Sequence, residues 1–297
     1  MRRREFLFLG SGVAIAGAAR AAGLPMQASA ADDMEILEAA LALHPGLHRY
    51  LSRDAYAATL QRLRDAYRAD TGLAARYLVL SRFLAAIRCG HSYCNFFNQK
   101  TTVKDALFDR PTRLPFHFAW VGDAMVVIRG FDTGLPAGSV VEALDGRSPV
   151  ALRRQLMPYV RADGHNDAKR VSLLEIRGDD AIETFDVFQG LLAPPADGVH
   201  RLLVRQPDGA SRRMEVTAIG LAARKAQMAA PAAADAPAWT WTMREDGIAV
   251  LGMPGWALWD SKWDWKAWLD ERLDGLDGAR GLVVDLRDNE GGDDCGD

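Results

Sequence analysis

The stretch that most constrains the fold is residues 280–292, which read RGLVVDLRDNEGG. Its first half is a mostly apolar run rich in β-branched residues, and glycines stand on both sides of it. This pattern predicts a buried, parallel β-strand that runs directly into a glycine turn. The pair Gly291-Gly292 lets the backbone turn sharply and direct its N–H groups into a cleft, where such groups stabilise a developing oxyanion. A tight turn without any chemistry is the alternative interpretation of the same spacing.

Three polar residues, Asp285, Arg287 and Asn289, accompany this apolar strand, and buried polar groups need partners. The string from Asp285 to Gly292, DLRDNEGG, resembles the DLRxNxGG motif of the carboxy-terminal-processing (tail-specific) serine peptidases, the family that includes the tricorn core. The resemblance implies that a backbone amide of Gly291 or Gly292 contributes to an oxyanion hole. It also implies that the three polar residues brace the turn, and that the substrate is a polypeptide cleaved through an acyl-enzyme.

A second motif is Gly90-His91-Ser92, directly after a predicted helix. A histidine that follows a glycine projects freely from a turn, although a satisfied loop histidine is the commoner case. In the same peptidase family a Gly-His-Thr/Ser sequence lies beside the active cleft, and in its tricorn-like members this histidine is the general base. The resemblance therefore implies that His91 is the base, or has a structural role if a lysine is the base instead. The chain departs from most relatives in having Cys89, not aspartate, before the glycine.

The sequence offers no candidate for the nucleophile that a serine endopeptidase needs. The last serine, Ser261, precedes the glycine turn, whereas the catalytic serine of the family follows it. Ser92 is not expected to serve, because adjacent residues of an extended chain point to opposite faces. We therefore expect the chain to be the N-terminal portion of a longer peptidase, inactive by itself, with a partly exposed and aggregation-prone C-terminal sheet.

The fold class predicted from the hydrophobic pattern is α+β, beginning with a helical N-terminal domain over residues 31–91. Apolar residues recur at helical spacing over residues 34–43, from Ser52 onward, and over residues 73–87. Aromatic residues on these faces are expected to belong to the core.

Residues 92–221 are predicted to be a β-rich region. Alternating apolar runs on either side of Gly122-Asp123 and of Asp208-Gly209 predict two hairpins. Between them, a strand, a turn at Asp145-Gly146 and a helix start at Ser148-Pro149 resemble the core of PDZ-like modules, which bind peptide termini at a sheet edge.

An Ala- and Pro-rich segment, residues 222–238, predicts a linker. The resemblance makes residues 239–297 the start of an incomplete α/β peptidase core of the ClpP/crotonase-like kind. Seven of the eight tryptophans lie there, and Trp256, Trp259 and Trp263 have the spacing of one helix face packed on a sheet. An aromatic wall for a ligand is the alternative. The alternative function is accordingly a non-catalytic periplasmic protein on the same scaffold that binds a peptide or a hydrophobic ligand.

The first 30 residues are predicted to be a cleaved leader. Arg3-Arg4-Glu5-Phe6-Leu7 resembles a twin-arginine export signal, and Ala28-Ser29-Ala30 provides a site of small residues for cleavage. The apolar run between them is short for a membrane anchor, which is the alternative. We expect an exported, periplasmic protein without a stable membrane span after cleavage.

Composition excludes several classes of partner. A formal net charge of −3 over 297 residues and the lack of a basic stripe argue against nucleic-acid binding. Cys89, Cys94 and Cys295 do not have the spacing of a zinc site, so neither a metal nor a cofactor is expected. A disulfide between Cys295 and one of the other two remains open, because export permits disulfides. Oligomeric state is not indicated.

Overall fold

The computed structural model describes residues 30–69, 72–228, 233, 235–287, 289 and 291–292. The chain forms two compact units, unit 1 (residues 1–229) and unit 2 (residues 230–297), and each is described by itself. The predicted leader lies outside the described residues except for Ala30, and Cys295 lies outside them as well.

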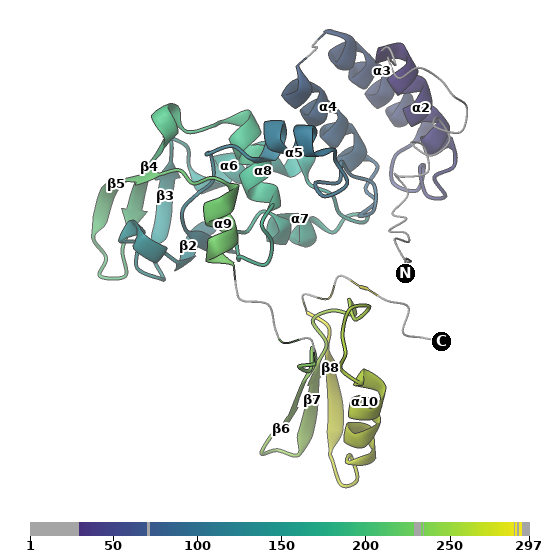
Figure 1. Cartoon of the computed structure of the whole chain (residues 1–297), viewed down its shortest axis with the longest axis vertical. Coiled ribbons are helices and arrows are strands. Elements are labelled where there is room, and N and C mark those ends of the chain that lie inside the picture. The colour runs from purple at the N-terminus through teal and green to yellow at the C-terminus, as the bar shows by residue number, and fades with distance from the viewer. Residues whose placement is uncertain are drawn as a thin grey trace, which may run out of the picture. The chain divides into compact units, whose positions relative to one another are not determined.

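Unit 1 begins with a small bundle of helices, α2 (Ala30–Ala42), α3 (Arg53–Ala69) and α4 (Leu73–Ala86), drawn in purple and blue in Figure 1. Ser52 prepares the start of α3, because its hydroxyl accepts the Ala55 N–H at 3.2 Å. The bundle has its own apolar core, formed by Met34, Leu41, Leu47, Leu60, Leu63, Phe83 and Ile87. The helices predicted from periodicity are therefore present.

The remainder of unit 1 is built on an antiparallel sheet with the strand order β1-β2-β3-β4-β5. Its strands are β1 (His117–Val121), β2 (Ala124–Arg129), β3 (Val140–Leu144), β4 (Val199–Arg205) and β5 (Ser211–Thr217). Both predicted hairpins are confirmed, with Gly122 and Gly209 in the turns at φ of 60° and 85°, which glycine adopts without strain.

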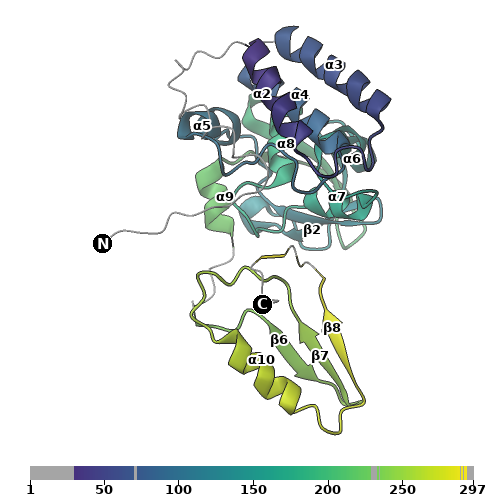
Figure 2. The same cartoon turned by 90° about the vertical axis from the view of Figure 1, so that its right-hand side faces the viewer.

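Helices between the strands complete the core of unit 1 (Figures 1 and 2). They are α5 (Thr101–Phe108), α6 (Pro149–Leu156), α7 (Asp167–Leu173) and α8 (Thr184–Leu192), with short 3₁₀ segments η1 (Phe131–Thr133), η2 (Met157–Tyr159) and η3 (Ala196–Gly198). As predicted, Ser148 caps α6 by accepting the Ala151 N–H at 3.3 Å. Fully buried side chains of strands and helices meet between them, among them Phe118, Met125, Leu152, Leu156 and Phe185.

The segment predicted to open the linker instead forms a helix, α9 (Leu221–Gln227). Arg224 explains the difference, since its side chain is fully buried and forms an ion pair with Asp186 at 3.0 Å. It also donates to the carbonyl oxygen of Leu114 at 2.7 Å. The linker predicted over residues 222–238 thus begins too early, because a buried ion pair ties its first turn to unit 1.

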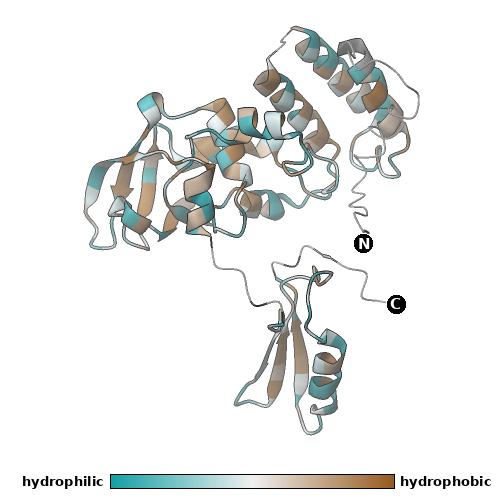
Figure 3. Cartoon of the chain, viewed as in Figure 1, coloured by the Kyte–Doolittle hydropathy of each residue, from teal (hydrophilic) through white to brown (hydrophobic). Residues whose placement is uncertain are grey.

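Unit 2 is a smaller sheet with one helix, made of β6 (Thr240–Met243), β7 (Ile248–Gly252), α10 (Trp265–Asp274) and β8 (Gly281–Asp285). The strands β6 and β7 are antiparallel, whereas β7 and β8 are parallel. The parallel strand predicted at the start of the glycine turn is therefore confirmed. Figure 3 shows the apolar colour along its strands.

Burial of β8, in contrast, is not found. Leu282, Val283 and Val284 are 37%, 48% and 48% exposed. Within the described part of unit 2 only β7 pairs with β8, so these side chains keep solvent contact. The partly exposed sheet expected from the sequence agrees with these values.

The tryptophans of unit 2 do not form the predicted helix face. Helix α10 starts only at Trp265, because the Asp264 carboxylate accepts the Ala267 N–H at 3.1 Å and caps it there. Trp239 is buried and its ring makes edge or tilted contacts with those of Trp263, Trp265 and Trp268. The aromatic cluster is therefore the core of unit 2, which argues against an aromatic wall for a ligand.

The chain is thus of the α+β class. None of the helices in the described ranges has the length and apolar character that crossing a membrane requires.

Candidate functional site

The loop that follows α4 carries His91 and is fixed to a second loop around residue 164. Arg88 turns the chain with a φ of 60°, and its carbonyl oxygen accepts the Gly164 N–H at 2.8 Å. Next to it, the Gly90 N–H donates to the Asp163 Oδ1 at 2.8 Å. Residues far apart in the sequence therefore hold the backbone on the N-terminal side of His91.

Glycine at position 90 gives the Asp163 carboxylate room to approach the backbone. A Cβ there would lie 2.9 Å from the Asp163 Oδ2, so this end of the aspartate side chain would have to shift. On the other side of the peptide, Arg161 Nη1 donates to the Gly90 carbonyl oxygen at 2.9 Å. The Gly-His pair seen in the sequence is therefore the point of close approach between the two loops.

The His91 side chain is exposed, and no described residue forms a hydrogen bond with its ring. The Cys89 thiol and the Asp163 carboxylate lie beside it, and one ligand atom from each of the three residues falls within 4.8 Å of the others. An exposed imidazole with a nearby carboxylate has the properties of an accessible base. Sequence reasoning missed Asp163, because only the fold brings its loop to residue 91.

Ser92 is bound to the turn after α2. The Gly46 N–H donates to His44 Nδ1 at 3.0 Å, so this nitrogen is unprotonated and the proton of the neutral ring is on Nε2. His44 Nε2 then donates to the Ser92 Oγ at 3.1 Å. The Ser92 hydroxyl is thus bound to one histidine and follows another in sequence.

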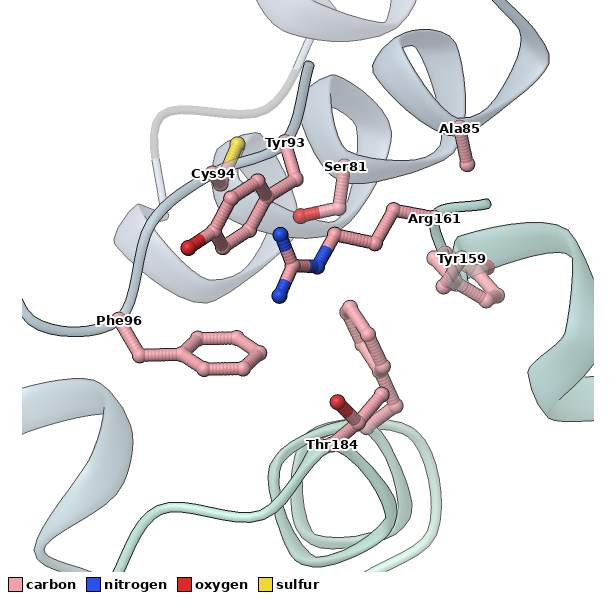
Figure 4. Close-up of a pocket in the computed structure, with 9 residues that line it drawn as sticks. Ser81, Ala85, Tyr93, Cys94, Phe96, Tyr159, Arg161 and Thr184 are labelled. Carbon is pink, nitrogen blue, oxygen red and sulfur yellow. The ribbon is translucent and has the colours of Figure 1, made fainter. Parts of the chain in front are cut away.

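A small pocket is lined by Tyr93 and Cys94, which directly follow this loop (Figure 4). The Arg161 guanidinium lies in its middle, with its Cζ 3.8 Å from the centroid of the Tyr93 ring, a cation–π contact. Phe96, Tyr159 and Phe188 provide further aromatic walls. Cys94 is also at this pocket, and burial raises the pKa of its thiol to about 12, which makes it unreactive at neutral pH.

The glycine turn after β8 is the second candidate element. Gly291 and Gly292 have φ of 92° and 147°, a region that favours glycine. A Cβ on Gly292 would lie 2.0 Å from the carbonyl carbon of Trp256, since the two residues form a parallel bridge. The Trp256 N–H donates to the Gly291 carbonyl oxygen at 2.9 Å. Position 292 therefore excludes every other residue type on two independent grounds.

The two candidate oxyanion amides differ. The Gly291 N–H donates to Asn289 Oδ1 at 2.7 Å, whereas the Gly292 N–H donates to none of the residues described. The Asn289 Nδ2 in turn donates to the Met253 carbonyl oxygen at 2.8 Å, so this side chain links the turn to the end of β7. Of the two amides, only that of Gly291 has a partner among the described residues.

Asp285 and Arg287 form a local ion pair at the end of β8. The Arg287 Nε donates to Asp285 Oδ1 at 2.8 Å, and the backbone N–H of Arg287 donates to the same oxygen at 3.1 Å. These hydrogen bonds lower the pKa of Asp285 to about 2. The carboxylate is therefore charged at any physiological pH and holds the chain as it leaves the strand.

The sequence-predicted site residues thus fall into two groups. His91 belongs to unit 1, where the structure adds Cys89 and Asp163, and the glycine turn with its three polar neighbours belongs to unit 2.

Comparison with known proteins gives no match to a protein family and none to a curated protein. Solved structures do match. Mature CPAF in complex with lactacystin has a TM-score of 0.58 at 16% sequence identity, and the match covers 89% of this chain and 57% of that chain. Mature CPAF gives 0.54 at 17% identity, over 89% of this chain and 56% of that one. A serine-to-alanine mutant of CPAF gives 0.57 at 15% identity, over 89% and 57%.

CPAF is a serine protease of the tail-specific type. Unit 1 holds 229 of the 297 residues, so a match over 89% of the chain draws on both units. The chain spans a little over half the length of the CPAF chains. At this identity the likeness concerns the fold: the chain has an α+β scaffold related to that of a serine protease.

Proposed function

We propose that the chain belongs to an exported serine endopeptidase of the tail-specific type, which cleaves polypeptides. The observation that carries the proposal is the fold shared with CPAF over 89% of the chain, a match that takes in both motif-bearing units. Two motifs add to it, the DLRDNEGG string with its glycine turn and the Gly-His pair. The PDZ-like character of residues 92–221, the ClpP/crotonase-like character of unit 2 and the twin-arginine leader are parts of the same proposal.

In the proposed reaction His91 is the general base. It takes the proton of a serine hydroxyl as the serine oxygen attacks the peptide carbonyl carbon, and later gives it to the leaving amine as the C–N bond breaks. Water then hydrolyses the ester by the same steps. The exposed ring supports this role, because a base has to be accessible to the hydroxyl whose proton it takes.

The Gly292 amide is the proposed oxyanion donor. Its N–H is not used by any described residue, whereas the neighbouring Gly291 amide already serves Asn289. Asn289, Asp285 and Arg287 hold the turn, so the amide is oriented before substrate arrives. Removal of one such donor typically costs about 10²–10³ in kcat.

We do not assign the nucleophile to a serine of the described residues. Ser92 already accepts a hydrogen bond from His44, and Ser261 lies before the glycine turn in sequence. The serine is proposed to come from a part of the protein outside this sequence.

A non-catalytic binding protein is the weaker candidate. Its sequence support is the PDZ-like segment together with the tryptophan-rich segment, and the tryptophan rings pack on Trp239 inside unit 2. Binding by the proposed PDZ-like region is compatible with either function.

A fluorophosphonate probe tests the proposal on the protein as its organism produces it. We expect covalent labelling of one serine, with the His91→Ala variant slowed by about 10²–10⁴-fold, the usual contribution of a general base. The matched control is His48→Ala, which removes an exposed histidine of the same unit and is expected to label normally. A protein that is folded but never labelled would contradict the peptidase and favour the binding protein.

A further inference from the structure

The side chains around position 91 form a ligand set that is larger than the proposed peptidase mechanism needs, because Cys89 has no part in that mechanism. Cys89, His91 and Asp163 each present one ligand atom, and these atoms lie within 4.8 Å of one another. A thiolate, an imidazole and a carboxylate together are ligands that Zn²⁺ takes in proteins. We infer that Cys89, His91 and Asp163 form a Zn²⁺-binding site.

The backbone keeps two of the ligands in place. Gly90 stands between Cys89 and His91, and its N–H donates to the Asp163 Oδ1, so the carboxylate is held against the peptide that joins the other two ligands. The absence of a Cβ at position 90 is what permits this approach, since a Cβ would lie 2.9 Å from the Asp163 Oδ2. The glycine therefore builds the site as well as the turn.

The distances require only a small adjustment. Zn–S and Zn–N or Zn–O bonds of about 2.3 and 2.0 Å in a tetrahedron separate the ligand atoms by roughly 3.3–3.6 Å. The present separations reach at most 4.8 Å. The His91 ring is exposed and forms no hydrogen bond with the described residues, so this ring is free to turn toward the other two ligands without breaking a hydrogen bond to them.

Charge and access also suit a divalent cation. The two anionic ligands neutralise Zn²⁺. Two cations of the same loops are engaged elsewhere: Arg88 donates to the Gly164 carbonyl oxygen at 2.9 Å and lies 3.9 Å from Asp167, and Arg161 donates to the Gly90 carbonyl oxygen at 2.9 Å. Cys89 and Asp163 line an open depression together with residues of the turn after α2, so an ion reaches them from solvent. Three protein ligands leave a fourth position for water.

The consequence for the enzyme rests on the proposed function. A zinc ion on the His91 imidazole occupies the nitrogen lone pair that would accept the serine proton. Zinc binding is therefore expected to switch off the peptidase reversibly, with activity restored by a chelator.

Cobalt titration of the whole, reduced, metal-free chain tests the site directly, because thiolate–Co²⁺ charge transfer gives an absorption band that other ligands do not give. We expect one equivalent of Co²⁺ to produce this band and Zn²⁺ to abolish it. Cys89→Ser is expected to lose the band, and His91→Ala and Asp163→Asn to weaken binding at least about tenfold, a loss typical of damaged metal sites. The asparagine oxygen still accepts the Gly90 N–H, so this variant removes the charge and keeps the loop.

His165→Asn and Cys295→Ser are the matched controls, one a histidine of the same loop as Asp163 and the other a cysteine outside the described residues. Both are expected to bind Co²⁺ as the parent does. A chain without a saturable thiolate band, or a band that survives Cys89→Ser and disappears with Cys295→Ser, would overturn the zinc site. Binding needs no catalysis, so a protein that binds Co²⁺ and is never labelled by fluorophosphonate would refute only the peptidase.

Discussion

Replacement of Gly292 by alanine separates the two physical reasons for a glycine in the turn after β8. The new Cβ would lie 2.0 Å from the carbonyl carbon of Trp256 and 2.3 Å from the Ala257 nitrogen, which are backbone atoms that a side-chain rotation cannot move. The residue would also have to keep a φ of 147°. The turn therefore has to open, and the bridge between positions 256 and 292 is lost.

The expected loss of free energy of unfolding in Gly292→Ala can be estimated by comparison with substitutions at neighbouring glycines. Gly291→Ala meets no atom within 4 Å but keeps a φ of 92°, so it measures backbone strain alone, about 1–3 kcal/mol. Gly292→Ala adds the lost hydrogen bond between the Trp256 N–H and Gly291, about 0.5–1.5 kcal/mol. We expect the free energy of unfolding of unit 2 to fall by roughly 2–4 kcal/mol. Gly281→Ala, with no atom near and no positive φ, is the control and is expected to be neutral or slightly stabilising.

Urea unfolding followed by tryptophan fluorescence is the appropriate assay, since seven of the eight tryptophans lie in unit 2. The predicted order of midpoints is Gly281→Ala, then Gly291→Ala, then Gly292→Ala as the lowest. Equal midpoints for the alanines at 281 and 292 would show that the turn does not approach Trp256, and the argument for an oriented Gly292 amide would fail with it.

Three further outcomes follow from buried charges in unit 1. Arg224→Met leaves the Asp186 carboxylate without its partner at 3.0 Å and is expected to lower the free energy of unfolding by about 3–5 kcal/mol, measured by urea unfolding followed by circular dichroism. The control Arg201→Ala removes an exposed ion pair and is expected to cost under about 1 kcal/mol. Equal costs for the two variants would contradict a buried ion pair. Burial and the charge of Asp186 raise the pKa of Glu183 from 4.5 to about 7, so the folded state favours the protonated carboxyl group. The stability that this preference contributes is lost as pH rises through that range, and amounts to about 3 kcal/mol at ~1.4 kcal/mol per pH unit. Burial lowers the pKa of His117 from 6.5 to about 4, so the folded state favours the neutral ring. The stability that this preference contributes is lost as pH falls through that range. Glu183→Gln removes the effect of Glu183 and keeps that of His117, so the free energy of unfolding of this variant is expected to rise between pH 4 and 6.5. A pH profile identical to that of the parent protein would contradict the pKa shifts of both residues.

Local signals in the sequence predicted most elements of unit 1. Gly122 and Gly209 mark the hairpins because a positive φ is required there, and Ser148 marks the start of α6 because its hydroxyl satisfies a free amide. Such features depend only on residues that are adjacent in the chain, so they can be interpreted without knowledge of the fold.

The errors concern long-range contacts. Helix α9 looked like a linker, because nothing within it reveals that Arg224 pairs with Asp186, a residue 38 positions away. The tryptophan spacing suggested a helix over residues 256–263, but Asp264 caps α10 after it and Trp256 is held by Gly292. A predicted buried strand, β8, is exposed among the described residues because burial depends on what covers it.

The candidate site divides in the same way. The Gly-His pair and the glycine turn could be found from the sequence, since both contain glycine at a point of close approach. Asp163 could not be found, because its place beside His91 depends on hydrogen bonds between two loops. The same contact places the Asp163 carboxylate beside the proposed base, where it is also the third ligand of the proposed zinc site.

The rate of fluorophosphonate labelling tests the central claim most directly, namely that His91 is the base of a serine peptidase. The protein as its organism produces it is compared with His91→Ala, and Asp105→Ala, at an exposed position of the same unit, is the control. We predict labelling at the parent rate for Asp105→Ala and labelling slowed by about 10²–10⁴-fold for His91→Ala. Labelling of His91→Ala at the parent rate would contradict the account.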